Sequence, residues 1–218
     1  MRALVSEHTG GDMLSSKGVK EIYVMLTFGC NIRCRICPYW GETGICHDAD
    51  LYERYKGKWD PVAMRRFLAG MREFGPRLLN ISGGEPLLSP HWADLARMAK
   101  VLEYEQVELT TNASFLAPKI EQVARLVDTL QVSFTSPTEW KRGFGMSGDT
   151  DPAEWGPALR AVFKQAKRVN PRLRIVVNYA LHREGVDAAE SFAGEALAEP
   201  GLVDAFHLVH PMYLSPSV

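Results

Sequence analysis

The chain has 218 residues, of which 46% are hydrophobic and 23% charged, with a formal net charge of −1. This length and composition fit one ordinary globular domain, and the near-neutral charge gives no general attraction for nucleic acid or anionic membranes, so neither is an expected partner. No apolar stretch reaches the roughly 20 residues that a membrane-spanning helix needs.

The chain is predicted to begin with a loose arm, residues 1–19, followed by one folded domain, residues 20–218. Met1–Gly18 is polar, contains several glycines and lacks the apolar run of a signal peptide. We therefore expect a cytoplasmic protein, in a compartment where thiols stay reduced. The four cysteines are then expected to act as ligands or nucleophiles rather than as a disulfide framework.

Strand and helix patterns alternate along the folded part. Short apolar runs bounded by turn signals predict six strands, at Ile22–Leu26, Leu78–Ser82, Val107–Thr111, Leu130–Thr135, Leu173–Ala180 and Val203–Val209. Helical spacing predicts five helices, opening at Asp60-Pro61, His91, Pro118, Gly156-Pro157 and Asp187. The first helix is expected to turn Met64, Phe67 and Leu68 inward. The fourth is placed at Pro157 because proline fits poorly deeper in a helix.

Thr27–Trp59, between the first strand and the first helix, is predicted to be irregular and holds every cysteine. Loops of this length in a compact domain are usually functional. The alternation of strands and helices indicates a parallel α/β sheet whose strands are buried on both faces. Active sites of such folds lie at the carboxyl ends of the strands. The cysteine loop and the turn Gly83-Gly84-Glu85 both follow strands, so we expect them at the same edge.

Three thiols occur within eight residues, in the segment Cys30-Asn-Ile-Arg-Cys34-Arg-Ile-Cys37. Thiolates are the usual ligands of iron–sulfur clusters. Three ligands on a four-iron cluster would leave one iron open to a substrate or cofactor. A structural zinc site, with Cys46 or His47 as fourth ligand, is the competing reading.

The spacing C-x3-C-x2-C directly after a first strand resembles the signature of the radical S-adenosylmethionine (SAM) superfamily. Three further landmarks resemble motifs of that family, in the family's order and after successive strands: Ser82-Gly-Gly-Glu-Pro86, Thr110-Thr-Asn-Ala113 and Val132-Ser-Phe-Thr-Ser-Pro137. The resemblance covers Lys20–His210 and is closest to SPASM-type enzymes, which modify peptides or small metabolites. Thr135 and Ser136 depart from the usual Asp and Gly, and no cysteine-rich extension is present for auxiliary clusters.

The resemblance implies a partial (β/α)6 barrel with two cofactors, a [4Fe-4S] cluster and SAM. It implies reductive cleavage of SAM to a 5′-deoxyadenosyl radical that abstracts hydrogen from a peptide or small-metabolite substrate. A reductant such as flavodoxin or ferredoxin is an expected partner. Because the last strand leaves an open edge, substrate, a partner protein or a further segment is expected to close the barrel mouth. The chain is read as either a piece of a longer protein or a complete minimal one.

The family's residue roles fall on particular positions. Cys30, Cys34 and Cys37 are implied as cluster ligands, and Glu85, in its ionised form, as the group that holds the SAM ammonium. The two glycines before Glu85 are expected to let backbone approach the methionine end of SAM. The other implied cofactor-binding residues are Ile36, Tyr39, Gly83, Gly84, Asn112, Ser133, Arg142 and Asn178. Candidates for a catalytic side chain are Cys46, His207 and His210.

Each of several of these residues also has a purely structural interpretation. Asn112 is also a common turn former, Ser133 is also a residue that packs on its strand, and Arg142 is also a surface residue. Cys46 is also read as a simple loop thiol. At the level of function, the alternatives are an activase of a glycyl-radical enzyme, a non-catalytic Fe–S electron carrier and a zinc-stabilised interaction module.

Overall fold

The computed structural model describes residues 18–34, 37–41, 44–56, 58–134, 152–181 and 186–209. The predictions for Ile36, Arg142 and His210, and for most of the N-terminal arm, lie outside the described residues.

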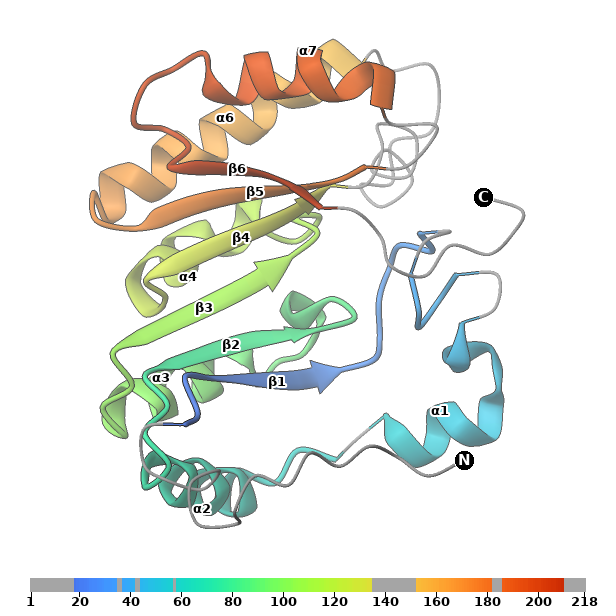
Figure 1. Cartoon of the computed structure of the whole chain (residues 1–218), viewed down its shortest axis with the longest axis vertical. Coiled ribbons are helices and arrows are strands. Elements are labelled where there is room, and N and C mark those ends of the chain that lie inside the picture. The colour runs from blue at the N-terminus through green and yellow to red at the C-terminus, as the bar shows by residue number, and fades with distance from the viewer. Residues whose placement is uncertain are drawn as a thin grey trace.

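Six parallel strands form one sheet in which every strand pairs with its neighbour in the chain, in the order β1-β2-β3-β4-β5-β6 (Figure 1). The strands are β1 (Glu21–Thr27), β2 (Leu78–Gly83), β3 (Gln106–Thr111), β4 (Thr129–Phe134), β5 (Arg174–Ala180) and β6 (Ala205–Val209). The sheet is open, with β1 and β6 at its two edges. The predicted partial (β/α)6 barrel is therefore confirmed.

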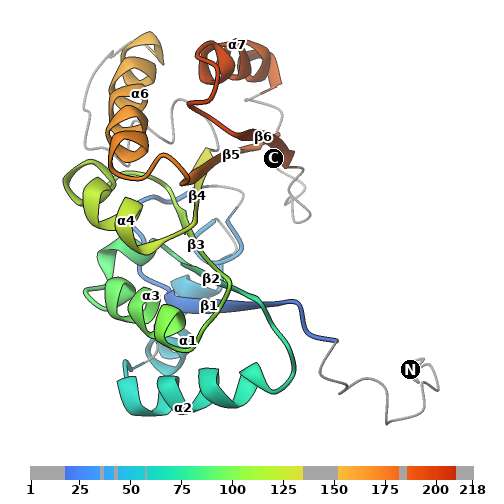
Figure 2. The ribbon, with the colours of Figure 1, turned by 90° about the vertical axis from the view of Figure 1, so that its left-hand side faces the viewer.

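The helices follow the strands along the chain. They are η1 (Ile45–His47), α1 (Ala49–Tyr55), α2 (Pro61–Arg72), η2 (Pro86–Leu88), α3 (Trp92–Val101), η3 (Ala117–Lys119), α4 (Ile120–Leu126), α6 (Pro152–Val169) and α7 (Val186–Leu197). In Figure 2, α3, α4 and α6 lie together on one side of the sheet, whereas α1 lies near the carboxyl ends of the strands in Figure 1. None of the described helices is long and apolar enough to cross a membrane.

In β2 to β5 the side chains alternate between a buried apolar face and a largely polar one. The apolar set is almost completely buried against the helices and comprises Leu79, Ile81, Val107, Leu109, Leu130, Val132, Ile175 and Val177. The residues between them include Asn80, Glu108, Gln131 and Asn178. The prediction that the strands are apolar on both faces is therefore wrong, because helices cover only one face. The polar face lines the inside of the open barrel.

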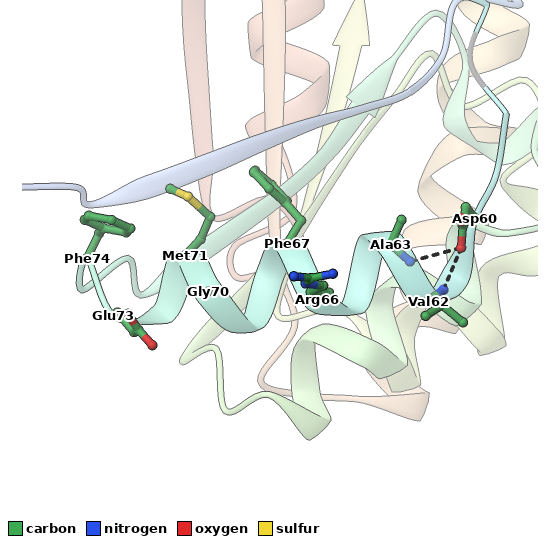
Figure 3. A pocket seen from close by; sticks show the side chains of 9 residues that line it. All are labelled: Asp60, Val62, Ala63, Arg66, Phe67, Gly70, Met71, Glu73 and Phe74. Atoms are coloured by element: carbon green, nitrogen blue, oxygen red, sulfur yellow. Dashed lines mark hydrogen bonds between the residues drawn. The ribbon is translucent and has the colours of Figure 1, made fainter.

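Helix α2 begins where the sequence predicts, but only part of its apolar side is buried against the sheet. Asp60 caps the helix as predicted, accepting hydrogen bonds from the backbone N–H groups of Val62 and Ala63, both at 2.9 Å (Figure 3). Leu68 is fully buried, but Phe67, which was predicted to face the core, is 51% exposed. Helix α2 lies beside the edge strand β1 (Figure 1), so the sheet covers only part of its apolar side.

Three other local predictions are wrong. The cysteine segment is not entirely irregular, since η1 and α1 form within it and Asp48 caps α1 by accepting from Leu51 N at 3.0 Å. Helix α6 begins at Pro152, where a proline at the first position loses no hydrogen bond, and it continues past Pro157. Helix α7 begins at Val186, so Asp187 is its second residue and not the residue before it.

Candidate cofactor site at the carboxyl ends of β1 to β3

The loops that follow β1 and β2 are joined by their backbones. Gly84 N donates to Thr27 O at 2.6 Å, and Glu85 N donates to Gly29 O at 2.7 Å. A Cβ atom on Gly83, which has φ +132°, or on Gly84 would come within 3.0 Å of the Thr27 or Gly29 carbonyl oxygen. The glycines therefore have a role that the sequence did not indicate: they let the Glu85 turn pack against the loop that carries Cys30.

Glu85 is fully buried and links the end of β2 to the end of β3. Its Oε1 accepts from Leu87 N at 2.9 Å and from Thr111 Oγ1 at 2.7 Å, and its Oε2 accepts from Asn112 N at 2.7 Å. Burial raises the pKa of this carboxyl, while the three hydrogen bonds and the nearby Lys119 ammonium act in the opposite direction. The Glu85 carboxylate is thus bonded to Thr111 and Asn112, which follow it by 26 and 27 positions in the sequence.

Asn112 lies between Glu85 and the cysteine loop. While its backbone N–H bonds to Glu85, its side-chain Nδ2 lies 3.7 Å from Cys30 Sγ and 3.0 Å from Asn31 Oδ1. Ser114 completes the cluster, because its N–H donates to Asn112 Oδ1 at 2.9 Å and its hydroxyl bonds to Asn31. Sequence reasoning missed Asn31 and Ser114, although both directly adjoin the recognised motifs.

The three cysteines of the motif are half-buried on one loop. Cys37 N donates to Cys34 O at 3.0 Å. Burial raises the pKa of the Cys30 thiol, and the negative charges of Glu85 and Cys37 add to this effect. Within the described segments, no three His, Cys, Asp or Glu side chains are grouped as a metal site. The donor set still suits a thiophilic centre, since metal coordination deprotonates a thiol outright.

The remainder of the cysteine loop is held by aromatic contacts. The Arg33 guanidinium lies 3.8 Å from the centre of the Trp40 ring, and Trp40 Nε1 donates to Phe28 O at 2.6 Å. The Tyr39 ring lies 5.2 Å from that of Phe28, so this predicted cofactor residue lies on the β1 side of the loop. His47 is a missed element of this packing, with its Nε2 lying 2.9 Å from Gly41 O.

Cys46 is buried, and its N–H donates to Tyr39 O at 2.9 Å. Burial raises the pKa of its thiol, with a further contribution from the charge of Cys37. A raised thiol pKa lowers the thiolate fraction and hence the reactivity.

The other predicted residues belong to a separate group on the inner face of the sheet. Ser133 and Asn178 pair in register on β4 and β5, and Asn178 pairs with His207 on β6. His207 Nδ1 lies 3.1 Å from Asn178 Oδ1. The structure therefore brings Asn178 together with His207, apart from Glu85 and Cys30.

The family is established by comparison with known proteins. The model of the radical SAM superfamily matches residues 24–143, which is more than half of the chain. The chain belongs to the radical SAM superfamily and is an enzyme of that superfamily, as its sequence predicts.

The chain is similar in sequence to two curated relatives and in fold to one solved structure. The GTP 3',8-cyclase of Listeria welshimeri is 35% identical over 102 residues, which are 46% of this chain and 28% of that protein. The PqqA peptide cyclase of Gluconobacter oxydans is 27% identical over 156 residues, which are 71% of this chain and 40% of that protein. Streptococcus suis SuiB bound to S-adenosylmethionine has the same fold, with a TM-score of 0.65 at 16% identity over 91% of this chain and 42% of SuiB. The chain thus spans less than half of each of these three proteins.

Proposed function

We propose that residues 20–218 form a radical SAM core in which Cys30, Cys34 and Cys37 hold a [4Fe-4S] cluster and SAM binds beside it. When bound, these cofactors supply reductive cleavage of SAM to a 5′-deoxyadenosyl radical that abstracts hydrogen from a substrate. The chain's own residues hold the cofactors, orient them and exclude water.

One observation carries this proposal: the cysteine loop, the Glu85 turn and Asn112 meet at one edge of the sheet. Two backbone hydrogen bonds join the Glu85 turn to the Cys30 loop. The backbone N–H of Asn112 donates to Glu85, while its side-chain Nδ2 lies near Cys30 Sγ. A zinc-stabilised loop would need no buried carboxylate on the next strand. A non-catalytic Fe–S electron carrier would likewise have no SAM for the Glu85 carboxylate to bind.

The donor and acceptor chemistry of these residues fits both cofactors. An amide N–H directed at a cysteine sulfur is a known means of tuning a cluster's potential, and Asn112 Nδ2 is directed in this way at Cys30 Sγ. Among the described residues Glu85 accepts three hydrogen bonds, whereas a carboxylate offers about four acceptor positions. Oε2 accepts only one of the three, so we propose this oxygen as the partner of the SAM ammonium once the groups that bury Glu85 move aside. Gly83, Gly84 and Tyr39 are proposed to border the same cofactors.

We propose a peptide as the substrate. SuiB has also been solved bound to its precursor peptide SuiA, and the PqqA peptide cyclase aligns with most of this chain. In Figure 2, α3, α4 and α6 lie on one side of the sheet, and β6 is an edge strand; a large ligand bound at that open edge would fit this arrangement. A nucleotide is the second candidate, because the higher identity is to a GTP 3',8-cyclase, although over less than half of this chain. A flavodoxin or ferredoxin as reductant and a cytoplasmic location complete the proposal.

The proposal is tested by purifying the chain without oxygen. Brown protein with about four iron and four sulfide per chain, which reductively cleaves SAM, is expected. Alanine at Cys30, Cys34 or Cys37 should abolish the cluster, whereas Cys46→Ala, the matched control, should retain it. Colourless protein with stoichiometric zinc would contradict the proposal, and loss of all metal in Cys46→Ala would contradict the ligand set.

A further inference from the structure

A row of polar side chains crosses the inner face of the sheet, with one residue from each of five adjacent strands. These are Asn80 on β2, Glu108 on β3, Gln131 on β4, Asn178 on β5 and His207 on β6. Glu108 is 8% exposed, whereas His207 at the far end is exposed. The row therefore runs from a buried carboxyl to an open imidazole.

Hydrogen bonds connect the row without a break. Glu108 Oε2 accepts from Asn80 Nδ2 and from Gln131 Nε2. Gln131 Oε1 in turn accepts from Asn178 Nδ2 at 3.0 Å, and Asn178 Oδ1 lies 3.1 Å from His207 Nδ1. Gln131 and Asn178 each direct the NH₂ group toward the Glu108 end of the row and the oxygen toward the His207 end.

The carboxyl group sets the direction of this chain. Since Glu108 Oε2 receives two donors, it acts only as an acceptor, and Gln131 must turn its NH₂ group toward it. The Gln131 oxygen is then left for the Asn178 NH₂ group, and the Asn178 oxygen is left for His207. An oxygen acceptor at 3.1 Å requires that His207 Nδ1 carries the hydrogen. In a neutral imidazole the other nitrogen, Nε2, is consequently an acceptor.

The row adjoins the cofactor site on the side of the amino ends of the strands. Thr110 Oγ1 donates to Asn80 Oδ1 at 3.1 Å, whereas the next two residues, Thr111 and Asn112, bond to Glu85. The row alternates along β2 to β5 with the buried apolar set, so it lies on the opposite face of the sheet, inside the open barrel. A ligand inside the barrel would therefore meet His207 and the cofactor edge together.

We propose that His207 Nε2 accepts a hydrogen bond from an N–H or O–H group of the substrate, and that Glu108, Gln131 and Asn178 are positioning residues that impose the required tautomer. In the described part of the chain, Nε2 makes no hydrogen bond of its own. A peptide amide is a donor of this kind. That the group bound by His207 belongs to the substrate rests on the proposed function, whereas the predicted Nδ1–H tautomer of His207 is independent of that function.

The tautomer can be measured on the full chain without cofactors, by long-range ¹H–¹⁵N correlation spectra of ¹⁵N-histidine-labelled protein. The spectra are recorded at alkaline pH, and ring ¹⁵N shifts that no longer change with pH show that the imidazole is neutral. The wild type is expected to carry the hydrogen on Nδ1 of His207. Gln131→Met cuts the chain at similar volume and should shift His207 to a mixture of tautomers. Gln106→Met is the matched control, because Gln106 is exposed on the same strand as Glu108 and should leave the spectrum unchanged.

A hydrogen on Nε2 in the wild type, or an Nδ1–H form that persists in both Gln131→Met and Asn178→Ala, would overturn the role of the row. If Gln131→Met does not fold, Asn178→Ala alone decides this, because it removes the direct partner of His207 far from buried Glu108. The open acceptor is probed with N-methylacetamide, which has an N–H donor, and N,N-dimethylacetamide, which has none. Only the first should move the Nε2 resonance, and equal or absent shifts would overturn the contact. Reductive SAM cleavage by the wild type tests the proposed function separately.

Discussion

Replacing Glu85 should destabilise the fold as well as weaken SAM binding. The carboxylate is fully buried and accepts from Leu87 N, Thr111 Oγ1 and Asn112 N. Glu85→Ala leaves three buried donors without a partner, at about 1–3 kcal/mol each. Relief of the desolvated charge offsets part of this, so we expect a net loss of about 3 kcal/mol or more in the free energy of unfolding.

Glu85→Gln separates the hydrogen bonds from the charge. Its remaining oxygen can still accept from Leu87 N and Thr111 Oγ1, but its NH₂ group would then face the Asn112 N–H, which leaves one donor unsatisfied. We expect a loss of about 1–3 kcal/mol in the free energy of unfolding. Loss of the charge should in addition weaken SAM binding by about 2–5 kcal/mol, because one partner of a desolvated charge pair is gone.

Urea unfolding of the chain without cofactors measures the first effect, and anaerobic calorimetry of SAM binding to the cluster-loaded chain measures the second. Glu105→Ala is the control, because Glu105 forms an exposed ion pair with Arg77 and should change stability by about 0.5 kcal/mol or less. Wild-type stability in Glu85→Ala would refute the role of Glu85 as a link between β2 and β3. Unchanged SAM affinity in a folded Glu85→Gln chain would refute its role at the ammonium.

Three further predictions concern the surroundings of the site. Gly84→Ala should lower the free energy of unfolding by about 1–3 kcal/mol or more, because its Cβ would overlap with backbone oxygens. Gly70→Ala is the control and should raise that free energy by about 0.5–1 kcal/mol, because its Cβ meets nothing within 4 Å. Equal effects of the two variants in thermal unfolding would contradict the packing of the Glu85 turn. Asp60→Ala should cost about 1 kcal/mol by removing the cap of α2, and Asp60→Asn much less; equal losses in urea unfolding would show that the cap hydrogen bonds do not matter. Burial raises the pKa of Glu108, so the folded chain binds more protons than the unfolded chain, and this group's contribution to stability is lost as the pH rises from the unfolded value of about 4.3 through the raised folded value. Glu108→Gln should remove that part of the pH dependence, and an unchanged stability–pH profile would count against a perturbed carboxyl at this position.

Local patterns predicted most of the architecture because they act over short stretches of chain. Apolar runs of strand length mark all six strands, and Asp60-Pro61 marks the start of α2, since capping needs only neighbouring residues. The spacing of Cys30, Cys34 and Cys37 and the Gly83-Gly84-Glu85 turn are likewise local, and the family match across residues 24–143 confirms the superfamily that they indicated.

The sequence by itself therefore determined the strands, their order along the chain, the family and some of the residues, among them Glu85 and Asn112, that meet at the carboxyl ends of β1 to β3. Only the tertiary structure decided which groups meet across strands. The carboxylate of Glu85 finds its donors on β3 and just beyond it, and Glu108 is connected to His207 through side chains from two intervening strands. These partners are far apart in the sequence, and parallel pairing alone brings them together. The polar inner face has the same origin, because helices on one side of a sheet pack against only alternate residues of each strand.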